Sequence, residues 1–169
     1  MKKIENLIES TAIAYYLAYR TLIEKHNELC MFYDEKFSVY VFPAISVSAL
    51  SCEIALKNHI FNEYGKLIKA HKLDKLFKKM GNDKQYHYKN TTIKFYNMSA
   101  FYTNSSDRID EISFDVFLKE NANAFVEWRY IYESPRKVDL DFLEALLFAL
   151  NDCDEDEYYD FLKQTRKAG

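Results

Sequence analysis

The sequence is poor in the residues that interrupt regular secondary structure. Its 169 residues include only three glycines and two prolines. These are too few for a β-sandwich with many tight turns, and they favour long helices joined by short loops. We therefore expect an all-α fold.

Cysteines and long apolar runs are also scarce. Cys30, Cys52 and Cys153 are odd in number and lack metal-ligand spacing, so we expect no metal site and a reducing, cytoplasmic setting. Glu5 and Glu9 interrupt the N-terminal residues, which argues against a signal peptide or a membrane span.

No glycine-rich phosphate loop or Gly-x-Ser-x-Gly elbow is present, so we expect no bound nucleotide cofactor and no α/β-hydrolase chemistry.

The composition is that of a globular protein. Hydrophobic residues make up 49% of the chain and charged residues 29%, and the length suits one domain spanning residues 1–169. The aromatic content is high, at 17%. Such side chains fill a core or a subunit contact, and they also stack on nucleic-acid bases.

Charge is unevenly distributed, although the net charge is only -3. Nine lysines lie between Lys57 and Lys89, whereas residues 139–160 hold nine acidic residues and no basic one. A lysine-rich face attracts nucleic-acid phosphates, but it is also compatible with a solvated helix face or with contact to the acidic region of a second copy.

Helical spacing of apolar residues predicts five helices. The first is expected to be central, with an apolar side formed by Ile4, Leu7, Ala14, Ala18, Leu22 and Leu29. The predicted helices span residues 4–29, 43–64 (ended by Gly65), 72–80 (ended by Gly81), 113–132 and 139–163. Residues 82–107 are compatible with either a strand pair or a tyrosine-rich helix.

Charged residues interrupt the apolar side of two predicted helices. Glu53 and Lys57 fall within the apolar arc of the second helix, and their spacing of four allows them to pair. Arg129 lies in the apolar arc of the helix predicted over residues 113–132, and Glu133 follows it by four. If the two helices pack together, these four residues form an internal charged network, which either handles an anion or RNA or fixes the helix register.

His71 is the best placed of the four histidines. It follows Gly65 and precedes the short helix that begins near Lys72. An imidazole with an ordinary pKa can donate and accept protons near neutral pH, whereas a residue near a helix start can also be purely structural.

The chain resembles uncharacterised bacterial HEPN-domain proteins over residues 43–150. The resemblance rests on three segments: Ser48-Ala49-Leu50-x-x-Glu53-x-x-Leu56-Lys57, His71-x-Leu73-x-x-Leu76-Phe77, and Phe125-x-x-Trp128-Arg129-Tyr130-x-Tyr132-Glu133. It implies a helical bundle, often a homodimer, from a stress, toxin–antitoxin or antiviral system. Many such proteins act on RNA, others only bind or scaffold, and some have a nucleotidyltransferase-like partner.

The sequence departs from the Arg-polar-x-His pattern of active HEPN ribonucleases. Arg20 and His26 have a matching spacing, but they lie in the first predicted helix and point about 120° apart. No histidine follows Arg129 at that spacing.

We hypothesise that the protein binds RNA or a nucleotide, with metal-independent RNA cleavage as a further expectation from the resemblance. Glu53, Lys57, His71 and Arg129 would be catalytic, with His71 as acid or base, Lys57 and Arg129 stabilising the phosphorane and Glu53 orienting one of them. Lys72, Lys75, Trp128 and Glu133 would bind the ligand. The alternative is a catalytically inactive protein-interaction or scaffold module.

Overall fold

The structure is a computed structural model, which describes residues 2–32, 39–128 and 138–166. These residues form helices and loops and contain no strand, which confirms the predicted all-α class. The helices are α1 (Lys2–Phe32), α2 (Val41–Tyr64), α3 (Leu73–Phe77), α4 (Asn82–Tyr102), α5 (Glu111–Glu120), α6 (Ala124–Trp128), α7 (Leu140–Leu150) and α8 (Glu155–Thr165). None of the described helices is long and apolar enough to cross a membrane.

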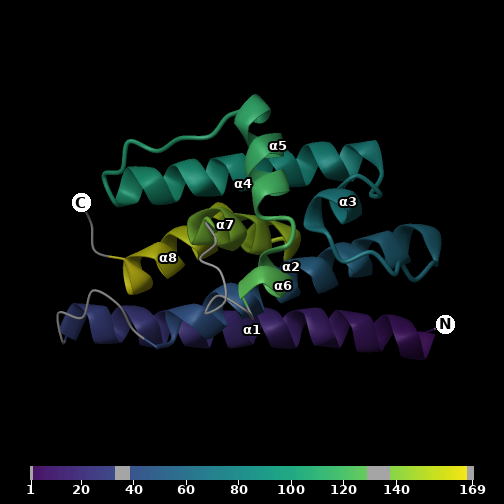
Figure 1. Cartoon of the computed structure of the whole chain (residues 1–169), viewed down its shortest axis with the longest axis horizontal. Coiled ribbons are helices and arrows are strands. Elements are labelled where there is room, and N and C mark those ends of the chain that lie inside the picture. The colour runs from purple at the N-terminus through teal and green to yellow at the C-terminus, as the bar shows by residue number, and fades with distance from the viewer. Residues whose placement is uncertain (1, 33–38, 129–137, 167–169) are drawn as a thin grey trace.

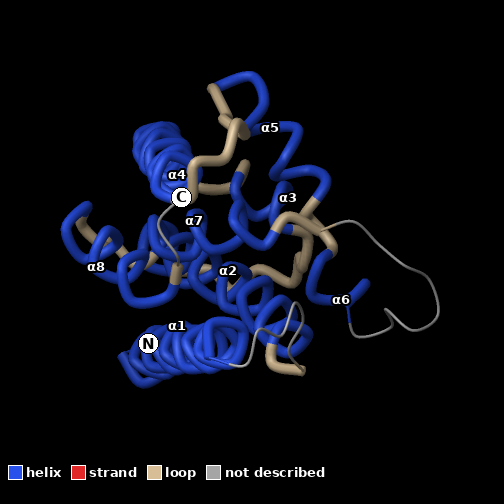
Figure 2. The backbone as a smooth tube through the Cα atoms, turned by 90° about the vertical axis from the view of Figure 1, so that its left-hand side faces the viewer, coloured by secondary structure: helices blue, strands red, loops and turns tan. Residues whose placement is uncertain are grey.

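The bundle is built around α7. Every residue from Phe142 to Leu150 is buried, as expected for a helix that is apolar on all sides. Helix α7 packs against both α2 and α4, and α1 covers α2 and α8 on the outside. Figures 1 and 2 show α1 and α4 on opposite sides of the layer that contains α2 and α7.

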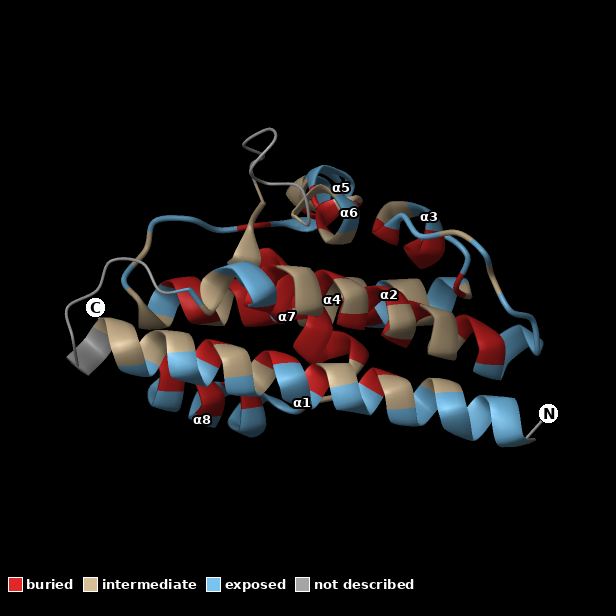
Figure 3. Ribbon diagram, turned by 60° about the horizontal axis from the view of Figure 1, so that its bottom comes forward, coloured by how far each residue is buried: buried red, intermediate tan, exposed pale blue. Residues whose placement is uncertain are grey.

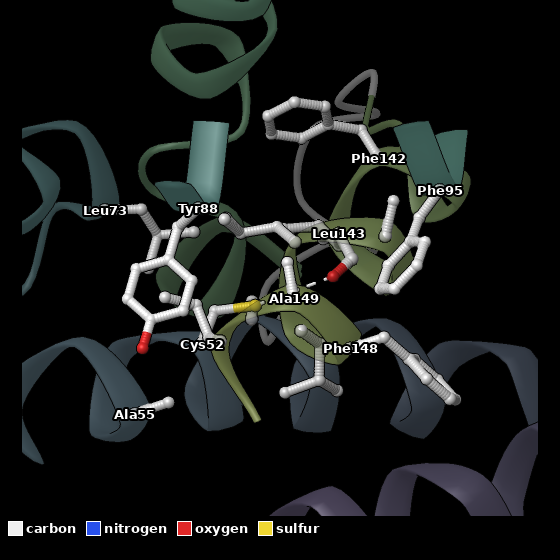
Figure 4. Close-up of a cluster of buried hydrophobic side chains, with 14 of the residues drawn as sticks. Cys52, Ala55, Leu73, Tyr88, Phe95, Phe142, Leu143, Phe148 and Ala149 are labelled. Atoms are coloured by element: carbon white, nitrogen blue, oxygen red, sulfur yellow. Dashed lines mark hydrogen bonds between the residues drawn. The ribbon is translucent and has the colours of Figure 1, made fainter. Parts of the chain in front are cut away.

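The close-up of the core shows how α7 fills the centre. Leu143 of α7 lies between Cys52 of α2 and Phe95 of α4, with Phe142 above it and Phe148 below it (Figure 4). The Cys52 thiol contacts the Leu143 carbonyl oxygen at 3.6 Å. Its role is that of a small buried hydrophobe, as expected for the cysteines.

Helix α1 is a long helix as predicted, but the expectations of its central position and of its buried side are wrong. Of the expected apolar side, Ile4 is 45% and Leu7 67% exposed. The buried residues are instead Ala12, Tyr16, Tyr19 and Ile23, which lie on a different side. Tyrosines supply this contact because their rings pack inside while their hydroxyls find polar partners. Figure 3 shows the exposed outer side, which extends to the N-terminal end.

The tyrosine-rich segment forms one helix, which settles the two alternatives left open for residues 82–107. Tyr88, Thr92, Phe95, Tyr96 and Ser99 of α4 are buried at a helical spacing. The Thr92 hydroxyl donates to the Tyr88 carbonyl oxygen at 2.7 Å, so this polar side chain is satisfied inside the helix.

The helix predicted over residues 113–132 is interrupted. Helix α5 begins earlier, at Glu111, because Asp110 and Ser113 form a capping box, and it ends at Glu120. The Asn121 amide then donates to the Phe117 carbonyl oxygen and its side-chain oxygen accepts from the Asp139 N–H. Because an asparagine side chain competes with helical hydrogen bonds, the chain turns at residues 121–123 before α6.

The helix predicted over residues 139–163 is also two helices. Asp152 adopts a left-handed conformation, with φ of 53°, which ends α7 beyond Asn151. The Asp154 carboxylate then accepts from the Glu157 N–H at 2.8 Å and caps α8. Aspartate tolerates the left-handed region and is a strong N-cap residue, so both signals for a break are local.

Candidate functional site

A buried carboxylate on α2 joins three of the sequence-predicted site residues. Glu53 is 5% exposed. Its Oε1 accepts from Lys57 Nζ at 2.7 Å and from His71 Nδ1 at 2.9 Å. The pairing of Glu53 with Lys57 follows from their i,i+4 spacing on α2. His71 reaches the same oxygen from the segment before α3.

His71 is positioned by Glu53 but remains accessible. Its side chain is 67% exposed. A carboxylate can only accept, so the proton on this contact belongs to Nδ1, and the neutral ring has an unprotonated Nε2. A carboxylate that orients an imidazole through one nitrogen and leaves the other free is an arrangement suited to acid–base chemistry. His71 does not cap α3, whose N-cap residue is Lys72.

Several lysines without ion pairs lie before and after His71 in the sequence. Among the described residues, no acidic group pairs with any of five exposed lysines: Lys66, Lys69, Lys72, Lys78 and Lys79. Lys75 contacts only the neighbouring Asp74, at 3.9 Å. We call residues 66–79 the lysine segment. Its ammonium groups are available to anions in solution.

The predicted site residues from the fourth helix do not complete this network in the described part of the chain. Arg129 and Glu133 lie outside the described residues. Arg129 was assigned to the apolar arc by assuming one continuous helix over residues 113–132, and the break at residues 121–123 shows that this assumption is wrong. Trp128 ends α6, which packs on α2. Its ring lies 6.1 Å from that of Phe42, and its buried Nε1 has no hydrogen-bond partner.

Arg20 and His26 have separate partners. The Arg20 guanidinium lies 3.3 Å from the Glu157 carboxylate and over the rings of Tyr16 and Phe161. The His26 ring is 3.7 Å from the Cys30 sulfur. Burial, followed by the charge of Arg166, lowers the pKa of His26. Arg20 is therefore a packing and ion-pair residue between α1 and α8.

A second buried charged cluster was missed by the sequence reasoning. Glu144 of α7 is fully buried and accepts from the hydroxyls of Tyr19 and Tyr158 and from Arg166 Nη2, the last at 3.0 Å. Arg166 also pairs with Asp141 at 2.7 Å. The signal was available in the sequence, because Glu144 is the one charged residue between Phe142 and Leu150.

The environment of Glu144 favours its neutral form, but Arg166 opposes this. Burial raises the pKa of Glu144, while the guanidinium lowers it. Burial and the Glu144 charge together raise the pKa values of Tyr19 and Tyr158, so both hydroxyls keep their protons. Glu144 contacts Tyr19, Tyr158 and Arg166 within the bundle, and of this group Arg166 Nε is buried without a partner. Because the charges pair with one another inside the core, we assign the cluster a structural role.

A third polar cluster links α2, α4 and the turn after α7. His59 Nε2 donates to the Leu150 carbonyl oxygen at 2.8 Å, and Nδ1 lies 3.3 Å from the Tyr88 hydroxyl. That hydroxyl donates to Asp152 Oδ1 at 3.0 Å. Burial lowers the pKa of His59, although Leu150 and Asp152 oppose the shift.

Comparisons with known proteins assign none of these clusters a role. No protein-family model, curated protein or solved structure matches this chain. Within the described ranges, no group of three or more histidine, cysteine, aspartate or glutamate side chains is arranged to hold a metal ion.

Proposed function

We propose that this protein is a HEPN-like helical domain of a bacterial stress or defence system that binds single-stranded RNA and cleaves it without a metal. The observation that carries the proposal is the Glu53–His71 pair, whose exposed imidazole belongs to the lysine segment. No other histidine in the described residues combines a carboxylate partner with comparable exposure to solvent.

The lysine segment supplies the binding step. Its ammonium groups neutralise backbone phosphates and release counterions, which makes affinity fall as salt is added. Five phosphate contacts on a single strand correspond to a slope of up to about −3.5 in a plot of log affinity against log salt, at about 0.7 per contact.

The Glu53–His71 pair supplies the chemistry. Unprotonated Nε2 of His71 takes the proton from a ribose 2′-hydroxyl, whose oxygen attacks the adjacent phosphorus. The bond from phosphorus to the 5′-oxygen breaks, and that oxygen takes up a proton. The products are a 2′,3′-cyclic phosphate and a 5′-hydroxyl end. Glu53 stabilises the imidazolium formed on the way, and lysine ammonium groups stabilise the charge on the phosphorane.

The test separates binding from cleavage. We expect purified protein, in the presence of EDTA, to cut an end-labelled RNA and leave 5′-hydroxyl ends. His71→Ala is expected to lose at least about 100-fold in rate, the usual size of an acid–base contribution, and to keep its RNA affinity. His87→Ala, a change at an exposed histidine of α4, is the matched control. Equal cutting by both variants would remove His71 from the mechanism.

A second candidate function is supported by the outer side of α1. Ile13 and Leu17, four residues apart on one side of α1, are 47% and 53% exposed, and neighbouring exposed apolar residues mark protein contacts. The competing proposal is a catalytically inactive module that associates with itself or with a partner protein through α1. RNA binding that is absent, or that does not weaken with salt, would favour this candidate.

A further inference from the structure

Helix α1 has an apolar side that its own bundle leaves largely exposed. Ile4 and Leu7 are 45% and 67% exposed, and Ala14 and Ala18 are exposed on the same side further along. We call this side the α1 stripe, which consists of Ile4, Leu7, Thr11, Ala14, Ala18 and Leu22. At about 100° per residue, the stripe covers an arc of about 80°, and its centre is turned about 130° from the buried side of the helix.

The α1 stripe carries no charge. Three charged residues occur within residues 4–22, namely Glu5, Glu9 and Arg20, and each lies at least about 140° from the centre of the stripe. The one polar member, Thr11, donates its hydroxyl to the Leu7 carbonyl oxygen at 2.6 Å. The solvent side of a helix normally carries charged residues, whereas a continuous exposed apolar surface marks a contact with another molecule.

The N-terminal turns of α1 gain little from the rest of the bundle. No residue from Lys3 to Thr11 is buried (Figure 3). Helices in proteins are stabilised mainly by the packing of one side against a partner, and the stripe begins in these turns. At a rise of 1.5 Å per residue, residues 4–22 span about 27 Å. The partner therefore needs an apolar side of comparable length.

The charges beside the stripe match a second copy of α1 that runs in the opposite direction. Lys3 and Glu24 lie on the same flank of the stripe, at its two ends. In a two-fold dimer the same patch meets itself, so antiparallel helices bring Lys3 of one protomer near Glu24 of the other. Within the described ranges Lys3 has no ion pair, and Glu24 has only a 4.0 Å contact with Arg20.

We propose that the α1 stripe pairs with the stripe of a second copy in an antiparallel, two-fold dimer. Ile4 of one protomer then packs against Leu22 of the other, and the small side chain of Ala14 near the two-fold axis lets the helices approach closely. Ile13 and Leu17 lie on a different side of α1, at least about 100° from the centre of the stripe. The inference therefore goes beyond the second candidate function and is compatible with either candidate.

The pairing also separates the two lysine segments. The turn after α2, where the lysine segment begins, lies toward the same end of the molecule as the N-terminus of α1 (Figures 1 and 3). Antiparallel pairing therefore places the two segments at opposite ends of the dimer. Each Glu53–His71 pair then works without residues of the other protomer, a consequence that rests on the proposed function.

Analytical ultracentrifugation tests the dimer. We expect the wild type at high micromolar concentration to have twice the mass of one chain, and to keep it in about 1 M salt, where charges are screened beyond about 3 Å. Ala18→Glu should be a monomer with unchanged helical circular dichroism, because Ala18 is exposed in the protomer and glutamate is a good helix former. Ile13→Glu, the matched control on another side of α1, should remain a dimer. A monomeric wild type, a dimeric Ala18→Glu variant or dissociation by salt would overturn the pairing.

Cysteine cross-linking tests the direction, in a Cys30→Ser, Cys153→Ser background that removes the two partly exposed thiols. Ala14→Cys lies near the two-fold axis, so its two copies should form a disulfide under mild oxidation. The two copies of Leu7→Cys would be about 18 Å apart along the helices, too far for a disulfide. A parallel pair would link at both positions. Cross-linking at Leu7, or its absence at Ala14, contradicts the antiparallel arrangement.

RNA cutting distinguishes failure of the pairing from failure of the proposed function. If the wild type cuts RNA, the monomeric Ala18→Glu variant should cut at the same rate per chain. Loss of cutting in this variant would show that the two protomers share a site, against the arrangement inferred from the fold. A wild type that is monomeric and still cuts RNA would refute the pairing alone, whereas a dimer without RNA binding would refute the proposed RNA function alone.

Discussion

Glu144 is held inside the bundle by two hydroxyls and one guanidinium. Removal of one partner from a buried ion pair is far more damaging than the pair itself is stabilising, because the remaining charge stays in a medium that solvates it poorly. Arg166 contributes the only cation to Glu144 among the described residues.

Replacement of Arg166 by methionine is expected to lower the free energy of unfolding by about 3–5 kcal/mol. The loss should grow as pH rises above the carboxyl pKa, because Glu144 escapes the cost by taking up a proton at low pH. Urea denaturation measures both effects. Lys163→Met, the same change on the exposed side of α8, should leave the free energy of unfolding almost unchanged, because exposed ion pairs contribute little. An equal cost for the two variants would contradict the structural role of Arg166.

His59 is expected to make the free energy of unfolding depend on pH in the mildly acidic range. Its folded-state pKa is lowered by burial, from an ordinary value of 6.5. The Leu150 carbonyl, Asp152 and Glu63 oppose the shift, and Lys84 adds to it. Because the unfolded chain binds the proton more readily, His59 contributes stability above pH 6.5, and this stability is lost as pH falls through the folded-state pKa.

We expect the free energy of unfolding to fall more steeply from about pH 7 to about pH 5 in the wild type than in His59→Gln, by up to about 1.4 kcal/mol per pH unit. Denaturant titrations across this range measure the difference. His87→Gln, on the surface of α4, should retain the wild-type slope. Parallel curves for the wild type and His59→Gln would show that His59 carries no such linkage.

Part of the candidate site could be predicted from the sequence because its spacing is local. Glu53 and Lys57 are four residues apart on one helix, so their pairing follows from helix geometry. The contact of His71 with Glu53 spans 18 residues and a loop, and no periodicity encodes it. The partners of Glu144 are farther still, since Tyr19 is 125 residues away.

At the scale of single helices, the C-terminus of α2 is fixed by one glycine. Gly65 has φ of 66°, and its N–H donates to the Phe61 carbonyl oxygen at 2.7 Å. A Cβ at this position would meet nothing within 4 Å. The cost of a side chain at this position is therefore backbone strain alone.

Gly65→Ala is expected to destabilise the protein by about 1–2 kcal/mol, the cost of a left-handed conformation for a residue with a Cβ. Gly65→Asn should cost less, because asparagine tolerates this conformation. Thermal and denaturant unfolding of the two variants would measure the difference. An alanine variant as stable as the asparagine variant would show that the helix end rearranges.

A glycine after an apolar run predicted the end of a helix correctly at Gly65 but not at Gly81. The helix predicted over residues 72–80 ends at Phe77, and Gly81 is the N-cap residue of α4. Asn121 and Asn151 are each compatible with a helix interior, and both breaks were missed. At Asn121 a distant group decides the outcome, since its side-chain oxygen accepts from the Asp139 N–H. Only the assembled bundle brings that donor to the turn.

At the scale of the whole molecule, the charge asymmetry of the sequence is only partly neutralised on folding. Lys94 of α4 pairs with Glu155 of α8, and Lys89 pairs with Asp115. The lysine segment, in contrast, keeps five ammonium groups without an acidic partner among the described residues. The bundle therefore presents a basic region before and along α3, and this region includes the exposed imidazole of His71.

The packing of α1 against α7 and α8 also means that α1 is synthesised well before the helices that it contacts. Tyr16 and Tyr19 find their polar partners 125 to 141 residues later in the chain. At about 5–20 residues per second, a ribosome needs on the order of 10 s to synthesise that interval. During this time Tyr16 and Tyr19 lack the partners that they have in the folded bundle. The nascent chain is therefore a candidate for chaperone binding until α8 has emerged.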